Sequence, residues 1–270
     1  MAPILPSDRE LIFFCKERGT RDIRVVHFSN IITVKFGLDI TPAEAATQQY
    51  VWKCVDPTIF RVPEVYRFFQ HKPQGRTLVT GYLVMENVHG TCLSEYLETA
   101  TPQDQVTIVD GIIKALQHLA AIPSPPGQGP GPVGRNPPRG YLWGDNGITS
   151  SFASISEMET WLDDLLDYLP DKPTDRFVFA PAELVMCHTD LAPRNILRLG
   201  DGQLALLDWG SAGFYPPVFE IYAFRTRVDR EPIFTQILSR LPQEEYYEEQ
   251  IQLLANIEYI LMRYGDTINL

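Results

Sequence analysis

His188, Asp190 and Asn195 stand close together in one short stretch, CHTDLAPRNIL, which covers residues 187–197. Apolar residues flank this stretch on both sides, so the three polar side chains belong to the edge of a hydrophobic core. A second carboxylate, Asp208, follows in the sequence LLDWG. Carboxylate and amide oxygens are the ligands that magnesium prefers in proteins. Brought together by the fold, these side chains would form a site for a hard cation.

A hairpin is the element that would bring two of these residues together. GDG at 200–202 is a turn signal between two apolar segments. Counting outward from this turn pairs Ile196 with Leu206 and leaves Asn195 beside Asp208 at the open end of the hairpin. Facing side chains on paired strands lie about 5 Å apart. The sequence therefore predicts a magnesium site formed by this Asn and this Asp.

The remaining polar residues complete the requirements of phosphoryl transfer. Asp190 lies on the loop that enters the hairpin and reaches the same space, and His188 can brace that loop from behind. Phosphoryl transfer needs one carboxylate to accept the hydroxyl proton, an Asn and an Asp to hold the metal, and a lysine on a strand paired with a glutamate on a helix. Lys35 and Glu44 have the residue types and the chain order that this last pair requires.

The elements that must position these side chains follow from capping signals and hydrophobic periodicity. The first 88 residues predict a small antiparallel sheet with one helix packed on it. The expected elements are a helix from the Ser7 capping box to Gly19, a hairpin of strands 23–28 and 31–37, a helix over 41–55, and strands within 62–70 and 76–88. The length of the chain favours two lobes that share one cleft, which we expect to be residues 1–88 and 89–270.

The second part of the chain changes in character and is expected to be mainly helical. Helical spacing appears after Gly90, again over 156–169, and in two stretches around 219–240 and 243–263. Residues 123–140 are so rich in Pro and Gly that they predict a long loop. Such a loop is either a linker or a functional lid or substrate loop.

Composition excludes several classes of partner. The 270 residues carry a formal net charge of -11, which argues against nucleic acid or an anionic membrane as the main partner and favours a cationic or neutral small molecule. No run of 18 apolar residues predicts a transmembrane helix. None of the four cysteines forms a C-x-x-C pair, so we expect no zinc site and a reduced, cytoplasmic protein. The oligomeric state is not readable.

The two motifs together carry a family resemblance. H-x-D-x-x-x-x-N at 188–195 followed by D-W-G at 208–210 resembles the aminoglycoside phosphotransferase and choline kinase-like family of the protein kinase-like superfamily, especially its fungal members. The segments VKFG, EAATQQYV, VPEVY and LVMENVHG are similar to that family's small lobe. The resemblance implies an α+β, two-lobed protein kinase-like fold, with a small antiparallel-sheet N-lobe carrying one helix, a mainly helical C-lobe, and ATP between the lobes.

The resemblance also implies roles for the residues of the catalytic loop. Asp190 would be the catalytic base, and Asn195 and Asp208 would bind Mg²⁺. A departure lies two residues after the base, where protein kinases usually carry a lysine and this chain has Ala192. Arg194 is the residue that could supply the missing charge, so we group it and the bracing histidine of the loop with the base as catalytic residues.

Nucleotide binding is implied at the other lobe. Lys35 would hold the α- and β-phosphates of ATP and pair with Glu44, unless this glutamate instead caps its own helix. The backbone of Glu86, Asn87 and Val88 would form the hinge that meets the purine. No Gly-rich loop is present to cover the phosphates.

These observations predict a small-molecule kinase that transfers the γ-phosphate of ATP to a hydroxyl of a small metabolite or antibiotic-like acceptor, cationic or neutral. The alternative is a repurposed or inactive kinase-like protein that uses the same cleft for ligand binding or other chemistry. The acids at 163, 164 and 167 are candidates to meet a cationic acceptor. Glu220 is expected to be a buried acid that anchors Arg225 or Arg227. The identity of the acceptor, and ATP against GTP, cannot be read from the sequence.

Overall fold

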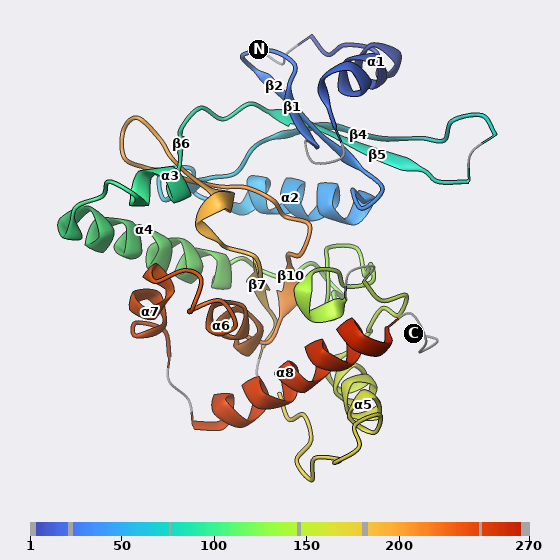
Figure 1. Cartoon of the computed structure of the whole chain (residues 1–270), viewed down its shortest axis with the longest axis vertical. Helices are drawn as coiled ribbons and strands as arrows, with labels where there is room; N and C mark the ends of the chain where they lie inside the picture. The colour runs from blue at the N-terminus through green and yellow to red at the C-terminus, as the bar shows by residue number, and fades with distance from the viewer. Residues whose placement is uncertain are drawn as a thin grey trace.

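The fold begins with a four-stranded antiparallel sheet that carries a helix on each face (Figure 1). The computed structural model describes residues 4–20, 24–75, 77–144, 147–179, 183–242 and 245–265. The sheet has the order β1-β2-β5-β4. In chain order the elements of this part are α1 (Asp8–Arg18), β1 (Val25–His27), β2 (Ile32–Gly37), α2 (Pro42–Cys54), β3 (Phe60–Arg61), β4 (Val65–His71) and β5 (Thr80–Glu86).

Alternation along β2 decides which side chains face which helix. Successive residues of a strand point to opposite faces of the sheet. Ile32 and Val34 are buried in a cluster with Leu11 of α1. Lys35 pairs in register with Leu83 of β5, which packs in a second cluster on the side of α2. The lysine therefore points at α2 because of its position in the strand.

The remaining elements include most of the helices, which lie beside and below α2 in Figure 1. They are β6 (Thr91–Cys92), α3 (Leu93–Leu97), α4 (Pro102–Ala120), η1 (Tyr141–Trp143), α5 (Ile155–Leu166), β7 (Val185–Cys187), η2 (Pro193–Asn195), β8 (Ile196–Arg198), β9 (Leu204–Leu206), β10 (Gly213–Tyr215), α6 (Val218–Arg225), α7 (Ile233–Leu238) and α8 (Glu245–Tyr264). The stretch expected to be helical around 219–240 is split into α6 and α7. Within the described residues, no helix is long and apolar enough to cross a membrane.

A second four-stranded sheet holds the predicted hairpin. Its order is β3-β9-β8-β6, and β3 runs parallel to β9. The short strand β3 thus joins the hairpin's sheet although it precedes residue 88, so this segment ties the two parts of the molecule together. Two apolar clusters surround the hairpin and the helices, one centred on α4 and α7 and the other on α5, α6 and α8.

The Pro/Gly-rich segment 123–140 contains no helix or strand, as predicted. It is nevertheless anchored, because Gly131 and Phe214 of β10 exchange backbone hydrogen bonds of 2.9 and 2.8 Å. This bridge fixes the loop on the strand that follows the D-W-G motif. The loop then continues into η1, which lies beside the catalytic loop described below.

We predict that Gly81→Ala destabilises the protein. A Cβ atom at Gly81 of β5 would overlap the backbone carbonyl of Ile40, which cannot move away as a flexible side chain would. Overpacking of this kind costs about 1 to 3 kcal/mol of unfolding free energy. Urea denaturation measures the loss. The control is Gly200→Ala, where nothing lies within 4 Å of the added atom and the expected change is within about 0.5 kcal/mol. Equal unfolding free energies for the two variants would contradict the packing described here.

Candidate active site

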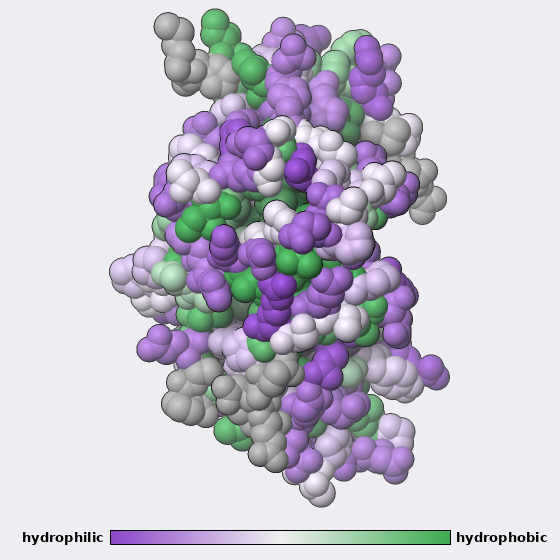
Figure 2. All heavy atoms as spheres, turned by 90° about the vertical axis from the view of Figure 1, so that its left-hand side faces the viewer, coloured by the Kyte–Doolittle hydropathy of each residue, from purple (hydrophilic) through white to green (hydrophobic). Residues whose placement is uncertain are grey.

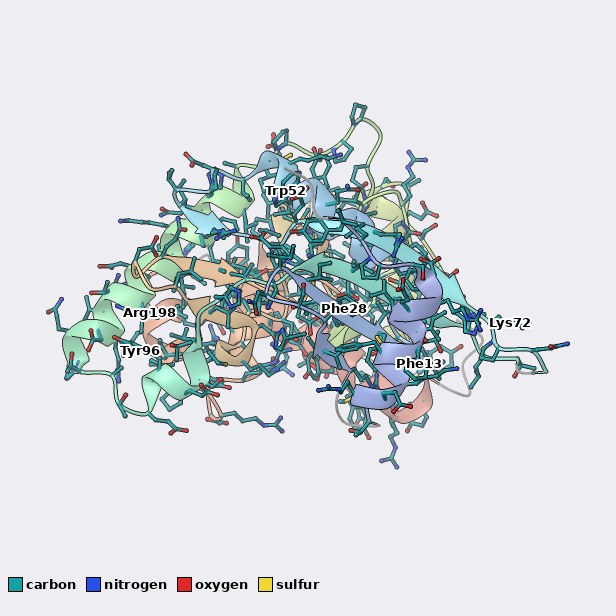
Figure 3. The ribbon with its side chains drawn as sticks, turned by 90° about the horizontal axis from the view of Figure 1, so that it is seen from above. Phe13, Phe28, Trp52, Lys72, Tyr96 and Arg198 are labelled. Atoms are coloured by element: carbon teal, nitrogen blue, oxygen red, sulfur yellow. The ribbon has the colours of Figure 1, made fainter. Side chains whose placement is uncertain are left out.

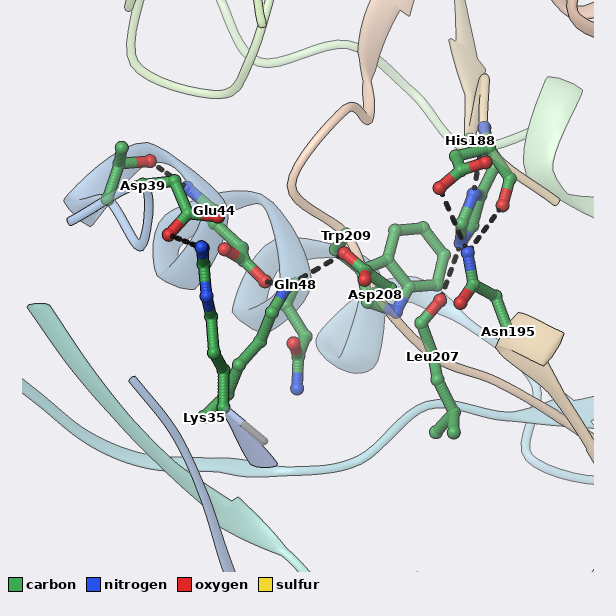
Figure 4. A network of polar contacts seen from close by, with 12 residues as sticks. Lys35, Asp39, Glu44, Gln48, His188, Asn195, Leu207, Asp208 and Trp209 are labelled. Atoms are coloured by element: carbon green, nitrogen blue, oxygen red, sulfur yellow. Dashed lines mark hydrogen bonds and ion pairs between the residues drawn. The ribbon is translucent and has the colours of Figure 1, made fainter. Parts of the chain in front are cut away.

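Lys35 stands at the centre of the site and joins the two parts of the molecule. Its ammonium Nζ lies 2.6 Å from Glu44 Oε1 and 2.8 Å from Asp208 Oδ1 (Figure 4). Burial alone would lower the pKa of Lys35, but the two neighbouring carboxylates outweigh burial and raise it. The lysine therefore stays charged, and one ammonium is shared by a carboxylate from each side of the cleft.

The side chain of Glu44 is free for this pairing. The backbone N–H of Glu44 donates to Thr41 Oγ1 at 3.2 Å, so the threonine caps α2 while the glutamate carboxylate extends to Lys35. The expected Lys35–Glu44 pairing is therefore confirmed, and the alternative that Glu44 caps its own helix is wrong. The pKa of Glu44 is raised overall, because burial and the charge of Asp208 outweigh the lowering effect of the Lys35 ammonium.

The predicted hairpin register is confirmed. Ile196 pairs with Leu206, and the N–H of Leu207 donates to the carbonyl of Asn195 at 2.8 Å. The chain leaves β9 through Asp208, whose φ of 64° lies in the left-handed region that few non-glycine residues adopt. This conformation turns the carboxylate back toward the cleft, where 42% of the side chain is exposed. Burial would raise the pKa of Asp208, but the charge of Lys35 prevails and lowers it.

His188 braces the catalytic loop from within the core. The ring is fully buried, its Nε2 donates to the carbonyl of Leu207 at 3.0 Å, and its Nδ1 accepts from the N–H of Asp190 at 3.4 Å. Burial lowers the pKa of His188, so the imidazole is neutral and carries its proton on Nε2. The histidine thus fixes the loop to the end of β9 and has no exposed atom with which to touch a substrate.

Asn195 is oriented by Asp190, which precedes it on the same loop. Its Nδ2 donates to the carbonyl oxygen of Asp190 at 2.8 Å and to the carboxylate Oδ2 at 3.0 Å. Since the nitrogen is used in this way, the amide oxygen Oδ1 is turned away from Asp190. This amide oxygen and the exposed carboxylate of Asp208 are hard donors that fit Mg²⁺. Among the described residues, no group of three or more His, Cys, Asp or Glu side chains is placed to hold a metal ion, so the amide oxygen is a necessary part of this site.

Two arginines meet the carboxylate of Asp190. Arg194 Nη2 lies 2.8 Å from Oδ1 and 3.0 Å from Oδ2, and Arg227 Nη1 lies 2.9 Å from Oδ1. The side chain of Arg227 is only 12% exposed. Two arginines therefore supply the positive charge that is missing at Ala192. The sequence predicted this role for Arg194, whereas it assigned Arg227 to Glu220.

The expected role of Glu220 as an anchor for Arg225 or Arg227 is wrong. Glu220 Oε2 accepts the backbone N–H groups of His188 at 2.6 Å and Thr189 at 2.9 Å, while Arg225 pairs with Glu248. The glutamate therefore holds the backbone of the catalytic loop. Thr189 has a φ of 58°, and the buried carboxylate stabilises this unfavourable conformation.

The three candidate hinge residues lie at the end of β5. Glu86 forms an ion pair with Arg61, and Asn87 Oδ1 accepts from the hydroxyl of Thr33 at 3.0 Å. The backbone N–H of Asn87 already donates to the carbonyl of Ile31 at 3.1 Å, so this N–H is not available to a purine in the present state. Val88 follows directly, on the segment that leaves the first sheet.

A cavity of about 580 Å³ opens between the two parts of the molecule and contains the charged cluster. Its walls include Lys35, Glu44 and Asp208. Arg24, the residue before β1, and Gly140 of the Pro/Gly-rich loop also line it. In place of a Gly-rich loop, the start of β1 therefore borders the space beside the lysine.

A larger groove of about 920 Å³ lies elsewhere, between α4 and the β8–β9 turn. These elements are on the left-hand side of Figure 1, the side that faces the viewer in Figure 2. The groove includes Arg198 and Tyr96, whose guanidinium and ring lie 4.6 Å apart and appear side by side in Figure 3. It contains none of the predicted site residues, so we place the site in the smaller cavity.

Residues 40–257 match the phosphotransferase enzyme family. The chain belongs to this family. As predicted, it is therefore a phosphotransferase. No curated protein matches the chain in a sequence search.

Solved structures show the fold of the phosphotransferase to be the two-lobed protein kinase-like fold. Aminoglycoside phosphotransferase APH(4)-Ia is 14% identical with a TM-score of 0.57, over 95% of this chain and 92% of that one. The GDP complex of wild-type aminoglycoside 2'-phosphotransferase-IIIa is 13% identical with a TM-score of 0.51, over 94% and 89%. A ternary complex of a thermostable APH(4)-Ia mutant with AMP-PNP and hygromycin B is 14% identical with a TM-score of 0.52, over 94% and 92%. The narrower resemblance to fungal members stays a prediction.

We predict that Glu220→Gln removes a pH dependence of stability. Burial raises the pKa of Glu220 to about 7 from an ordinary value of 4.5, against the lowering effect of its two N–H donors. The folded state thus favours the protonated acid, and its contribution, on the order of 3 kcal/mol, is present below about pH 4.5 and lost as the pH rises toward 7.

Urea denaturation at several pH values between 4.5 and 8 measures this contribution. The unfolding free energy of the unaltered protein should fall relative to that of Glu220→Gln over this range. Glu248→Gln, which alters an exposed carboxylate, is the matched control. Its unfolding free energy should depend on pH in the same way as that of the unaltered protein. Parallel pH profiles for the unaltered protein and Glu220→Gln would contradict the assignment.

Proposed function

We propose that this phosphotransferase transfers the γ-phosphoryl group of ATP to a hydroxyl group of a small molecule. The observation that carries the proposal is the position of Lys35, whose ammonium joins Glu44 and Asp208 at hydrogen-bond distance beside the loop of Asp190 and Asn195. A strand lysine, a helix glutamate and a metal-binding Asp in this arrangement are the positioning parts of phosphoryl transfer.

The nucleotide side of the cleft would act through charge. In the proposed complex the Lys35 ammonium donates to the phosphate oxygens, and Glu44 keeps the lysine in place. Asp208 and the Oδ1 of Asn195 would hold Mg²⁺, together with phosphate oxygens. Magnesium, when bound, neutralises the charge that develops on the transferring group. Backbone groups at Glu86–Val88 would meet the purine.

The acceptor side would act through Asp190. Its carboxylate accepts the proton of the attacking hydroxyl, and Asn195 fixes its orientation through the two hydrogen bonds given above. Arg194 and Arg227 lie close enough to stabilise negative charge on the transferring group. These cations weaken one ground for the alternative of a repurposed or inactive kinase-like protein, namely the charge missing at Ala192.

The comparisons support a nucleotide and a small-molecule acceptor but do not name this chain's own. Among the similar structures, one contains AMP-PNP and hygromycin B and another contains GDP. In this chain the acceptor side is bordered by the Pro/Gly-rich loop and η1.

We predict that MgATP stabilises the protein and that the effect requires Asp208. A ligand that binds only the folded state adds about 2.7 kcal/mol at a concentration one hundred times its dissociation constant. Thermal unfolding with ATP, with and without Mg²⁺, is measured for the unaltered protein and Asp208→Ala. The control is Asp201→Ala, in the exposed turn of the same hairpin. A magnesium-independent shift, or one retained in Asp208→Ala, would contradict the proposed metal ligand.

We predict that Asp190→Asn strongly slows transfer without preventing nucleotide binding. Loss of a general base lowers the rate by roughly 10² to 10⁴. Transfer of labelled γ-phosphate to an acceptor found by screening hydroxyl compounds gives the rate, and the MgATP-dependent thermal shift shows that the variant is folded. Full transfer by Asp190→Asn would exclude this carboxylate as the base.

A further inference from the structure

A cluster of cations surrounds the proposed base on the side where an acceptor must arrive. Arg194 and Arg227 both reach Asp190 Oδ1, as given above. Between the arginines lies Tyr141 of η1, with its hydroxyl 3.4 Å from Arg194 Nη2 and its ring centroid 4.2 Å from the guanidinium carbon of Arg227. Arg139, from the same loop, borders both the nucleotide cavity and the space beside Tyr141.

The ion pairs on the two sides of the cleft differ in composition. Asp190 is one carboxylate that two guanidinium groups contact directly. Two further acids lie nearby: Glu258 accepts from the hydroxyl of Tyr222, and the buried Glu220 is close enough to Arg227 to interact with its charge. On the opposite side of the cleft the balance is reversed, because Glu44 and Asp208 share the single ammonium of Lys35. The nucleotide side thus suits a divalent cation, whereas on the acceptor side two guanidinium groups compete for the same carboxylate oxygen.

Two of the three acids that the sequence suggested for a cationic acceptor, Asp163 and Asp167, have partners elsewhere. Asp163 of α5 accepts the backbone N–H of Phe177 at 2.9 Å. Asp167, at the end of the same helix, pairs with Lys172 and Arg176 at 3.4 and 3.7 Å. Neither acid borders the cavities beside Asp190.

We propose that the phosphate acceptor carries an anionic group, a carboxylate or a phosphate, near the hydroxyl that is phosphorylated, and that Arg227 binds this group together with Arg194. The inference rests on the proposed function, since it concerns the acceptor of that same transfer. It replaces the expectation of a cationic acceptor.

The reason is the competition for Asp190 Oδ1. A hydroxyl that gives its proton to this carboxylate must take a hydrogen-bonding position that an arginine now occupies. Arg227 is nearly buried, and a buried guanidinium that loses its carboxylate partner needs another anion. The planar fork of arginine matches carboxylate and phosphate oxygens with two parallel hydrogen bonds. A cationic acceptor would instead add a third positive charge beside these two.

The space for this group is occupied in the present state. The cavity bordered by Tyr141, Thr189, Tyr222 and Arg227 has a volume of about 20 Å³, which is room for about one water molecule. An acceptor must therefore displace Tyr141, and Gly140 and Gly144 on either side of η1 have positive φ values of 108° and 76°. Trp143 and Phe219 border the same cavity and would contact the carbon skeleton of the acceptor.

The test compares matched pairs of probe compounds on the full chain, with and without Mg²⁺ and AMP-PNP. Glycerate, 3-hydroxybutyrate and shikimate are each titrated beside their primary amides, with glycerol 3-phosphate as the phosphate probe and ethanolamine and hygromycin B as cationic probes. Binding is followed by ligand-observed NMR and calorimetry. We expect at least one anionic probe to bind at least about tenfold more tightly than its uncharged partner, as a charge-assisted hydrogen bond would give.

Variants locate the binding group. Arg227→Gln should remove the preference for the anion, and Arg227→Lys should retain part of it. Arg225→Gln is the matched control, because Arg225 lies two residues away and pairs with Glu248 outside the cavity. If Arg227→Gln does not fold, Arg194→Gln, on a side chain that is 47% exposed, takes its place.

Three outcomes would overturn the proposal. The first is tighter binding of the amides or cationic probes than of the anionic probes. The second is no binding of any anionic probe at millimolar concentrations. The third is an Arg227→Gln variant that binds AMP-PNP more weakly but keeps the preference for the anionic probes. The nucleotide titration separates this failure from failure of the proposed function. A protein that binds MgAMP-PNP but prefers uncharged or cationic probes remains a kinase of another acceptor, whereas one that binds no nucleotide contradicts the proposed function itself.

Discussion

The rest of the structure depends on one shared charge, the ammonium of Lys35 between Glu44 and Asp208. The lysine is 14% exposed and the glutamate side chain 2%, so neither charge is tolerable without its partner. Because Lys35 belongs to β2 and Asp208 follows β9, the pair fixes the first sheet relative to the hairpin. A shift of either element by a fraction of a turn or strand would leave a buried charge without a partner.

The catalytic loop is held by a second set of buried polar groups behind the cleft. Glu220 takes two backbone N–H groups of the loop, and His188 links the loop to the carbonyl of Leu207. Thr189 and Asp208, the two residues with left-handed backbone in this region, lie on either side of that histidine contact. Such conformations persist only where the surroundings over-determine them. The buried acid and the neutral imidazole supply this support through the backbone, so the side chains of Asp190 and Asp208 can bind the charged groups of the cleft.

The parts of the site that could be predicted are those that local periodicity determines. The register of the hairpin follows from one turn signal, and the direction of Lys35 follows from alternation along β2. Arg227 and Glu220 could not be assigned in this way, because their partners lie more than thirty residues away in the chain and several pairings of nearby charges were equally consistent with the sequence. Tyr141 was hidden for a different reason, since a loop rich in Pro and Gly has no period from which a path can be derived.

The acceptor proposed from the site differs from the one that net charge favours, and the difference has a physical reason. A formal charge of -11 describes the whole surface, and exposed charges farther apart than about 8 to 10 Å are largely screened in salt. What an acceptor meets at Asp190 is set by the groups within one or two hydrogen bonds, and these are Arg194, Arg227 and Tyr141. The acids of α5 belong to the same acidic total, yet they act on their own helix and its neighbouring loop. Local charge therefore has to be counted side by side across the cleft, where the carboxylates gather at the lysine and the guanidinium groups gather at the base.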